Sequence, residues 1–129
     1  MNQPFQKTEP PMIEEALLTI KAWSFYSKAG DYVSMNNLCL RDSKFAEITG
    51  MCERGSRIGI RFYYEFTGLK LVNIDNNDGK AIISGRIKLI QSGGSLISSG
   101  KIMAEAKQFP TLEGEEQWKL SEIEIEWDD

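Results

Sequence analysis

The chain has 129 residues, of which 41% are hydrophobic and 26% are charged, and its formal net charge is −4. These proportions are typical of a globular protein and exclude a disordered chain. Because the charge is acidic, there is no basic field to neutralise phosphates, and we expect no nucleic-acid partner. No apolar stretch reaches the roughly 20 residues that cross a bilayer, and no secretory signal opens the chain. We therefore expect a cytoplasmic protein without a membrane partner.

The sequence contains no histidine and only two cysteines, Cys39 and Cys52. Histidine is the commonest general base and zinc ligand and is the partner of most catalytic serines and cysteines. We therefore expect neither a metal nor another cofactor. Two cysteines without a secretory signal favour reduced, buried thiols over a disulfide.

The N-terminal third of the chain predicts a helical layer. Residues 1–11 are polar and proline-rich, which predicts a flexible arm before a single domain of residues 12–129. From Met12 to Lys28, apolar residues recur at helical spacing on two faces, so this helix should be buried on two sides. Gly30 suits the end of that helix, and Asp31 can cap a second helix over residues 32–40.

The middle of the chain gives a less regular pattern. Lys44–Thr49 alternates weakly and predicts a short strand, and Gly50–Gly55 predicts a loop. The residue pattern of Ser56–Phe66 is compatible with two kinds of secondary structure. Its apolar residues alternate as in a strand, but Ser56 can also cap a helix whose aromatic residues lie three and four apart. The pattern alone does not decide between them.

The rest of the chain predicts antiparallel strands joined by hairpins, which makes the fold α+β. Gly100 predicts a bend or close packing within its strand. The apolar face switches between Leu120 and Ile123, which predicts a β-bulge near Ser121–Glu122. The predicted strands are Leu69–Ile74, Lys80–Gln91, Leu96–Phe109 and Trp118–Trp127, with an acidic loop over residues 110–116.

Several short motifs resemble the nuclear transport factor 2-like superfamily, in its ketosteroid isomerase-like and polyketide cyclase-like (SnoaL-like) branch. Lys28–Tyr32 is similar to the Ala-Gly-Asp joint after the first helix of these proteins. Asp78–Arg86 resembles one of their hairpins, and Trp118–Leu120 the opening of their last strand. Leu40–Glu47 is similar to the entry of their short strand, and Glu53–Ile58 to the start of their third helix.

The resemblance implies a cone, in which three N-terminal helices pack on a strongly curved antiparallel sheet. It implies a helix over residues 56–66, an apolar pocket at the open end of the cone, and a homodimer through the outer face of the sheet. The candidate pocket residues are Trp23, Tyr26, Phe45, Ile48, Phe62, Tyr63, Met103 and Trp118.

The catalytic residues of the family are not found at the matching positions. The isomerases of this family use an aspartate on the short strand as a base and a tyrosine on the first helix as an oxyanion donor. The corresponding residues here are Ile48, which cannot accept a proton, and Trp23, which offers only an N–H donor. A slip of one residue in the short strand would place Glu47 at the base position.

Glu105 is the other candidate catalytic carboxylate. If Met103 and Glu105 point inward, the carboxyl group enters an apolar pocket, where it could serve as a neutral donor. In the alternative, Ala104 and Ala106 point inward and Glu105 pairs with a lysine at the surface. The small size of the alanines favours the alternative, because the inside of a tightly curved sheet has little room.

These observations leave three functional hypotheses. The first is a binding protein for a small apolar ligand, without the usual catalytic residues. The second is a non-catalytic dimerisation or interaction module. The third is an isomerase or cyclase-type enzyme that uses Glu47 or Glu105. A cone filled by Trp23 and Tyr64 would favour the interaction module, and a deep pocket with a buried carboxylate would favour the enzyme.

Overall fold

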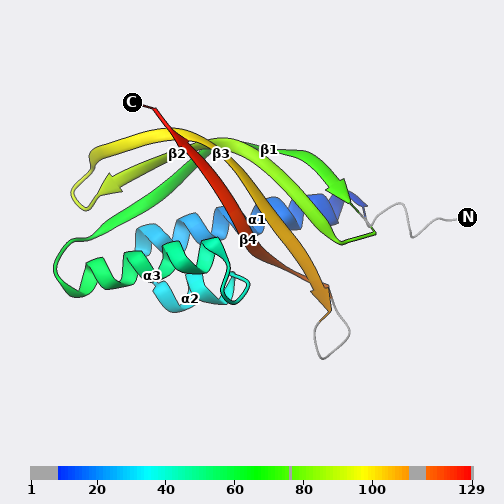
Figure 1. Ribbon diagram of the computed structural model, residues 1–129, viewed down its shortest axis with the longest axis horizontal. Coiled ribbons are helices and arrows are strands. Elements are labelled where there is room, and N and C mark those ends of the chain that lie inside the picture. The colour runs from blue at the N-terminus through cyan, green and yellow to red at the C-terminus, as the bar shows by residue number, and fades with distance from the viewer. Residues whose placement is uncertain (1–8, 76, 111–115, 129) are drawn as a thin grey trace, which may run out of the picture.

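A computed structural model describes residues 9–75, 77–110 and 116–128, and the predicted acidic loop lies mostly outside them. Three helices precede four strands, and all the helices lie on one side of the sheet (Figure 1). Among the described residues, no helix is both long and apolar enough to cross a membrane. The elements are α1 (Glu9–Ala29), α2 (Tyr32–Asn37), α3 (Lys44–Arg57), β1 (Phe62–Asp75), β2 (Lys80–Gln91), β3 (Ser95–Pro110) and β4 (Glu116–Trp127).

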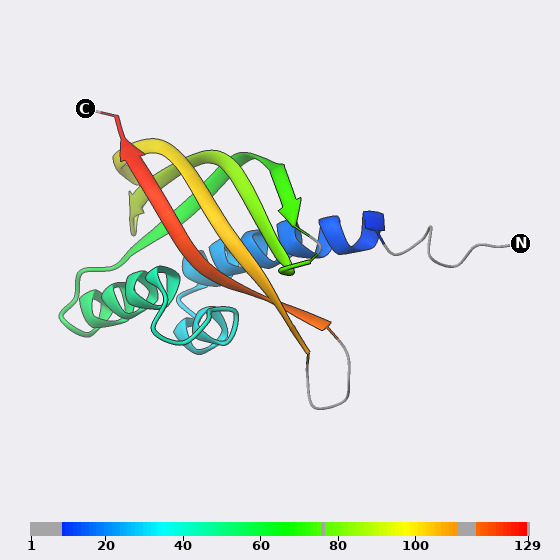
Figure 2. The same ribbon diagram turned by 45° about the vertical axis from the view of Figure 1, so that its right-hand side comes forward.

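The sheet is an antiparallel meander in the order β1-β2-β3-β4, so β1 and β4 are its edges. Register shifts in every strand pair bend it over α1 (Figure 2). The predicted bulge in β4 is confirmed, since Ala104 pairs with Ile123 and Ala106 with Leu120. Two residues of β4, Ser121 and Glu122, therefore lie opposite one residue of β3.

The joint between the first two helices is as predicted. Gly30 has a φ of 75°, which an L-residue with a side chain rarely adopts, and it ends α1. The Asp31 carboxylate accepts a hydrogen bond from the backbone N–H of Ser34 at 3.1 Å and so caps α2. Helix α1 begins at Glu9, inside the predicted arm, and α2 ends at Asn37, three residues before its predicted end.

The predictions of a strand over residues 44–49 and a loop over residues 50–55 are wrong, because both segments belong to α3. The Ser43 hydroxyl accepts a hydrogen bond from the backbone N–H of Ala46 at 3.1 Å and caps this helix. Its buried residues Phe45, Ile48, Thr49 and Cys52 follow the spacing of one helical face. Tertiary packing of that face outweighs the low helix propensity of the glycines.

The prediction of a helix over residues 56–66 is also wrong. Helix α3 ends at Arg57, the chain turns through Gly59 with a φ of 85°, and β1 begins at Phe62. The alternation of apolar residues was therefore the correct signal for this segment. Two of the motif matches fail with it, since Leu40–Glu47 leads into α3 and Glu53–Ile58 ends α3.

The core lies between α1, α3 and the inner face of the sheet. Helix α1 contributes Ala16, Ile20 and Trp23, each of which is fully buried. The sheet contributes small and branched side chains, which allow α1 to approach the strands closely. The buried apolar residues of the strands include Ala81, Ile83, Ile87, Ile102, Ala104, Ala106, Leu120 and Ile123.

Candidate functional site

The centre of the cone is filled by aromatic side chains around Trp23. The Trp23 ring lies 5.2 Å from the Phe45 ring and 5.7 Å from each of the rings of Tyr64 and Phe66, measured between centroids. The Trp23 Nε1–H donates a hydrogen bond to Thr49 Oγ1 at 3.0 Å. The contacts satisfy both the apolar body and the polar edge of the indole. Trp23 is therefore part of the packed core.

The structure brings six of the eight predicted pocket residues to this core and leaves two outside it. Tyr63 lies at the edge of the sheet beside α1, and Met103 is 44% exposed on the outer face of the sheet. The six residues in or against the core are Trp23, Tyr26, Phe45, Ile48, Phe62 and Trp118.

Glu47 lies on the surface of α3. Its side chain is 62% exposed, and its carboxylate is 3.4 Å from Lys44 Nζ, one helical turn away. The one-residue slip proposed for Glu47 required a strand, and this segment is helical. Its neighbour Ile48 is buried on the inner side of the same helix.

Glu105 lies on the outer side of β3, and Ala104 and Ala106 are buried on the inner side, as the alternative prediction held. The Glu105 carboxylate accepts a hydrogen bond from Ser121 Oγ at 2.8 Å. It also lies 3.8 Å from Lys80 Nζ and 4.0 Å from Lys107 Nζ. This carboxylate therefore sits among polar groups at the bulge rather than in an apolar pocket.

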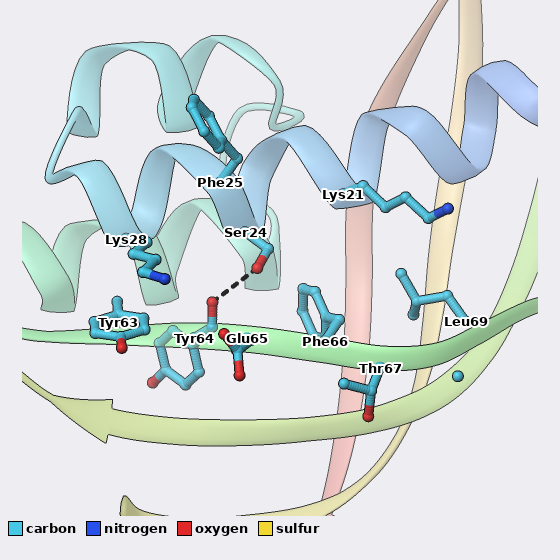
Figure 3. A pocket seen from close by; sticks show the side chains of 11 residues that line it. Lys21, Ser24, Phe25, Lys28, Tyr63, Tyr64, Glu65, Phe66, Thr67 and Leu69 are labelled. Carbon is cyan, nitrogen blue, oxygen red and sulfur yellow. Dashed lines mark hydrogen bonds between the residues drawn. The ribbon is translucent and has the colours of Figure 1, made fainter. Parts of the chain in front are cut away.

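A groove between α1 and β1, which we call the α1–β1 groove, was not predicted from the sequence. Its volume is about 480 Å³. Figure 3 shows Lys21 and Lys28 at opposite ends of the groove, with Ser24 between them. The spacing of these three residues on one helical face is the only local signal that points to it. The lining residues are Lys21, Ser24, Phe25 and Lys28 of α1 and residues 63–69 of β1.

Two hydrogen bonds from α1 hold the wall of this groove in place. The Ser24 hydroxyl donates to the carbonyl oxygen of Tyr64 at 2.9 Å, and the Tyr64 N–H donates to the Ser27 hydroxyl at 2.9 Å. Both backbone groups of Tyr64 therefore face α1, on the free edge of β1. At the end of the groove, Lys28 Nζ lies 5.9 Å from the centroid of the Tyr63 ring, a cation–π arrangement.

The outer face of the sheet carries a second hollow, the outer-face hollow, of about 790 Å³. Lys70 and Lys101 lie on its β1 and β3 sides, and Glu124 and Glu126 on its β4 side. Because Lys101 pairs in register with Glu126, and Met103 with Glu124, these side chains share one face of the sheet. The lining of the hollow is therefore basic on its β1 and β3 sides and acidic on its β4 side.

Solved structures of known proteins resemble the chain over almost its whole length, whereas no family model and no curated protein sequence matches it. Aln2 from a Streptomyces species superposes with a TM-score of 0.65 at 10% identity, covering 92% of this chain and 91% of that one. ActVI-ORFA from Streptomyces coelicolor gives 0.61 at 14% identity, covering 89% and 96%. The intermembrane space region of the chloroplast protein ARC6 gives 0.59 at 14% identity, covering 88% and 95%.

The chain has the nuclear transport factor 2-like fold. The predicted cone of helices on a curved antiparallel sheet is thereby confirmed. At such low identities the likeness concerns the fold alone, so the function has to be argued from this chain's own residues.

Within this nuclear transport factor 2-like fold, the described residues include no group of three or more His, Cys, Asp or Glu that could hold a metal ion. Cys39 and Cys52 are both buried free thiols. Burial raises the pKa of Cys52 from its ordinary value of 9.0 to about 12. Burial, and to a smaller extent the neighbouring Cys52, raises the pKa of Tyr64 from 10.0 to about 12.

The stability of the domain is therefore expected to fall as the pH rises above about 9, as these pKa values imply. The unfolded chain releases the Cys52 proton from 9.0 and the Tyr64 proton from 10.0, while the folded chain keeps both up to about 12. In that window the unfolded state binds fewer protons, so each group lowers the free energy of unfolding by up to about 1.4 kcal/mol per pH unit. Urea unfolding at a series of alkaline pH values measures this slope. In Cys52→Ala the slope should be shallower, and an unchanged slope would contradict the assignment.

Proposed function

We propose that this chain is a non-catalytic interaction module that forms a homodimer through the outer face of its sheet. The observation that carries the proposal is the division of that face into a basic region and an acidic region. Antiparallel sheets commonly leave one face to water, so an uncovered face alone would indicate nothing. A face that is charge-complementary to itself indicates a second copy of the same chain as the partner.

The geometry of such a dimer follows from the register of the strands. A two-fold axis parallel to the strands, placed above the boundary between β3 and β4, lays the β4 side of one copy over the β3 side of the other. Because Lys101 is in register with Glu126, it then lies over the partner's Glu126 and within side-chain reach of the partner's Glu124, two residues along the same strand. The contact occurs twice. Of the cations that line the hollow, Arg86 is already held by an ion pair with Asp128, which leaves Lys70 and Lys101 for the partner.

The filled interior supports the same conclusion. A ligand inside the cone would have to part the rings of Trp23, Phe45 and Tyr64, and Trp23 and Phe45 are fully buried. Neither Glu47 nor Glu105 reaches this interior, so the enzymatic hypothesis lacks the buried carboxylate it requires. An interaction surface needs neither feature.

A charge-swap experiment tests the proposal. Lys101→Glu and Glu124→Lys should each weaken the homodimer by tenfold or more, because each places like charges together at two symmetric contacts. An equimolar mixture of the two variants should dimerise again, since the carboxylate introduced in one variant then meets the ammonium group introduced in the other. Sedimentation equilibrium over a concentration series at low salt measures these affinities.

Lys44→Glu is the matched control, because it makes the same change of charge as Lys101→Glu but at an exposed position on α3. This variant should dimerise as the wild type does. A wild-type chain that remains monomeric at the highest concentration would refute the proposal. Failure of the mixture to restore the dimer would refute the contact between Lys101 and Glu124.

A further inference from the structure

We propose that the α1–β1 groove binds a linear amphipathic carboxylate, with the carboxylate at Lys21 and the apolar chain lying along Phe66 towards Tyr63. This inference goes beyond dimerisation, because the groove lies at the β1 edge of the sheet and not on its outer face. It also differs from the apolar ligand expected inside the cone, both in position and in charge.

The groove has the size and the lining of a small-molecule site. Its volume of about 480 Å³ lies within the range of roughly 300–1,000 Å³ found for such sites. Phe66 and Leu69 are half-buried and pack against the core, so they present a fixed apolar surface. On the core side, the Phe66 ring packs against the Trp23 ring, with 5.7 Å between the two centroids.

The charges of the groove select an anion. Lys21 and Lys28 are seven residues apart, which places them about 10 Å apart along one face of α1. Lys28 is already placed over the Tyr63 ring, while Lys21 forms no ion pair with any residue in the described part of the chain. Glu65 also lines the groove, but it lies opposite Lys88 in the register of β1 and β2. Lys21 is therefore the cation that a carboxylate would meet.

The edge of β1 supplies a further donor. The backbone groups of Tyr64 face α1, as their bonds to Ser24 and Ser27 show. Backbone N–H groups point to alternate sides along a strand, so the N–H of Phe66, two residues after Tyr64, points to the same edge. The register shift of β1 begins only after Thr67 and does not disturb this alternation. An amide donor and an ammonium group next to an apolar surface match a carboxylate that carries a hydrocarbon chain.

Binding of octanoate, followed by ¹H–¹⁵N NMR, tests the proposal. Octanoate should shift the amide signals of residues 21–28 and 63–69, and octanol should bind more weakly because it lacks the charge. Butanoate should also bind more weakly, since each buried methylene contributes up to about fourfold in affinity. Lys21→Gln should weaken octanoate binding by roughly fivefold, and raised salt should reduce this difference.

Lys44→Gln is the control, because Lys44 is an exposed lysine on α3, away from the groove. It should leave the affinity for octanoate unchanged. Signal shifts scattered over the surface, equal binding of octanol and octanoate, or full affinity in Lys21→Gln would each overturn the proposal. The outcome is separable from dimerisation, since Glu124→Lys alters only the outer face and should retain octanoate binding.

Discussion

Trp23→Ala is expected to lower the free energy of unfolding by about 3–5 kcal/mol, the usual range for removing a buried Trp. Trp23 is fully buried, and its ring contacts those of Phe45, Tyr64 and Phe66. Alanine would leave a cavity between the Phe45 ring of α3 and the Tyr64 and Phe66 rings of β1, two elements that cannot readily close the gap. It would also leave the Thr49 hydroxyl without the indole donor. Urea unfolding followed by circular dichroism measures the loss without relying on tryptophan fluorescence.

Two substitutions on α1 make this prediction specific. Trp23→Phe keeps an aromatic ring but removes the N–H donor to Thr49, so its effect should be clearly smaller than that of alanine. Phe25→Ala removes an aromatic side chain two residues further along, where it is 68% exposed, and should change stability by no more than about 1 kcal/mol. Equal losses for Trp23→Ala and Phe25→Ala would show that the cone is not centred on Trp23.

The parts of the fold that the sequence predicted well are those set by local signals. The strand over residues 80–91 is found with its predicted bounds, because Gly79, with a φ of 62°, and the turn through Gly93 and Gly94 delimit it. The end of α1 at Gly30 and the cap at Asp31 are likewise encoded by adjacent residues. In each case the chemistry that fixes the boundary lies within a few residues of it.

Helix α3 was missed because its two glycines resemble loop residues. Both Gly50 and Gly55 lie inside the helix. A Cβ atom at Gly55 would lie 2.8 Å from the carbonyl oxygen of Ile60, so this glycine allows the chain to fold back closely after the helix. That contact depends on how the chain turns after the helix, and the pattern of residue types does not reveal it. The resemblance of residues 53–58 to a helix start then extended the error to the following strand.

The α1–β1 groove could not be predicted for a similar reason. Its two walls are joined by the hydrogen bond from Ser24 to Tyr64, which lie 40 residues apart in the sequence. Neither Ser24 nor Ser27, the two serines of α1 that bond to β1, has sequence neighbours that distinguish it from any other serine on a helix. The inward placement of Ala104 and Ala106, by contrast, followed from their small size, because burial in a curved sheet depends on the side chain itself.

Gly100→Ala is expected to lower the free energy of unfolding by about 3 kcal/mol, at the upper end of what overpacking usually costs. Gly100 lies in β3 opposite the end of β4, where it pairs with Trp127. An added Cβ atom would lie 2.5 Å from the carbonyl oxygen of Glu126 and 2.9 Å from the Cα of Trp127. Both atoms belong to the backbone, so β4 would have to move away from β3. Thermal and urea unfolding measure the loss.

Gly50→Ala is the matched control for this substitution, since it adds the same methyl group inside a helix. Its nearest neighbour outside the helix backbone would be the terminal nitrogen of Arg54 at 3.1 Å, the end of a flexible side chain that can turn aside. Because glycine is unfavourable within a helix, this variant should gain roughly 0.5–1 kcal/mol. A Gly100→Ala protein as stable as the wild type would mean that β3 and β4 do not approach each other closely at this point. The acidic side of the proposed dimer surface would then be placed differently, because Glu124 and Glu126 lie on the strand that this contact holds.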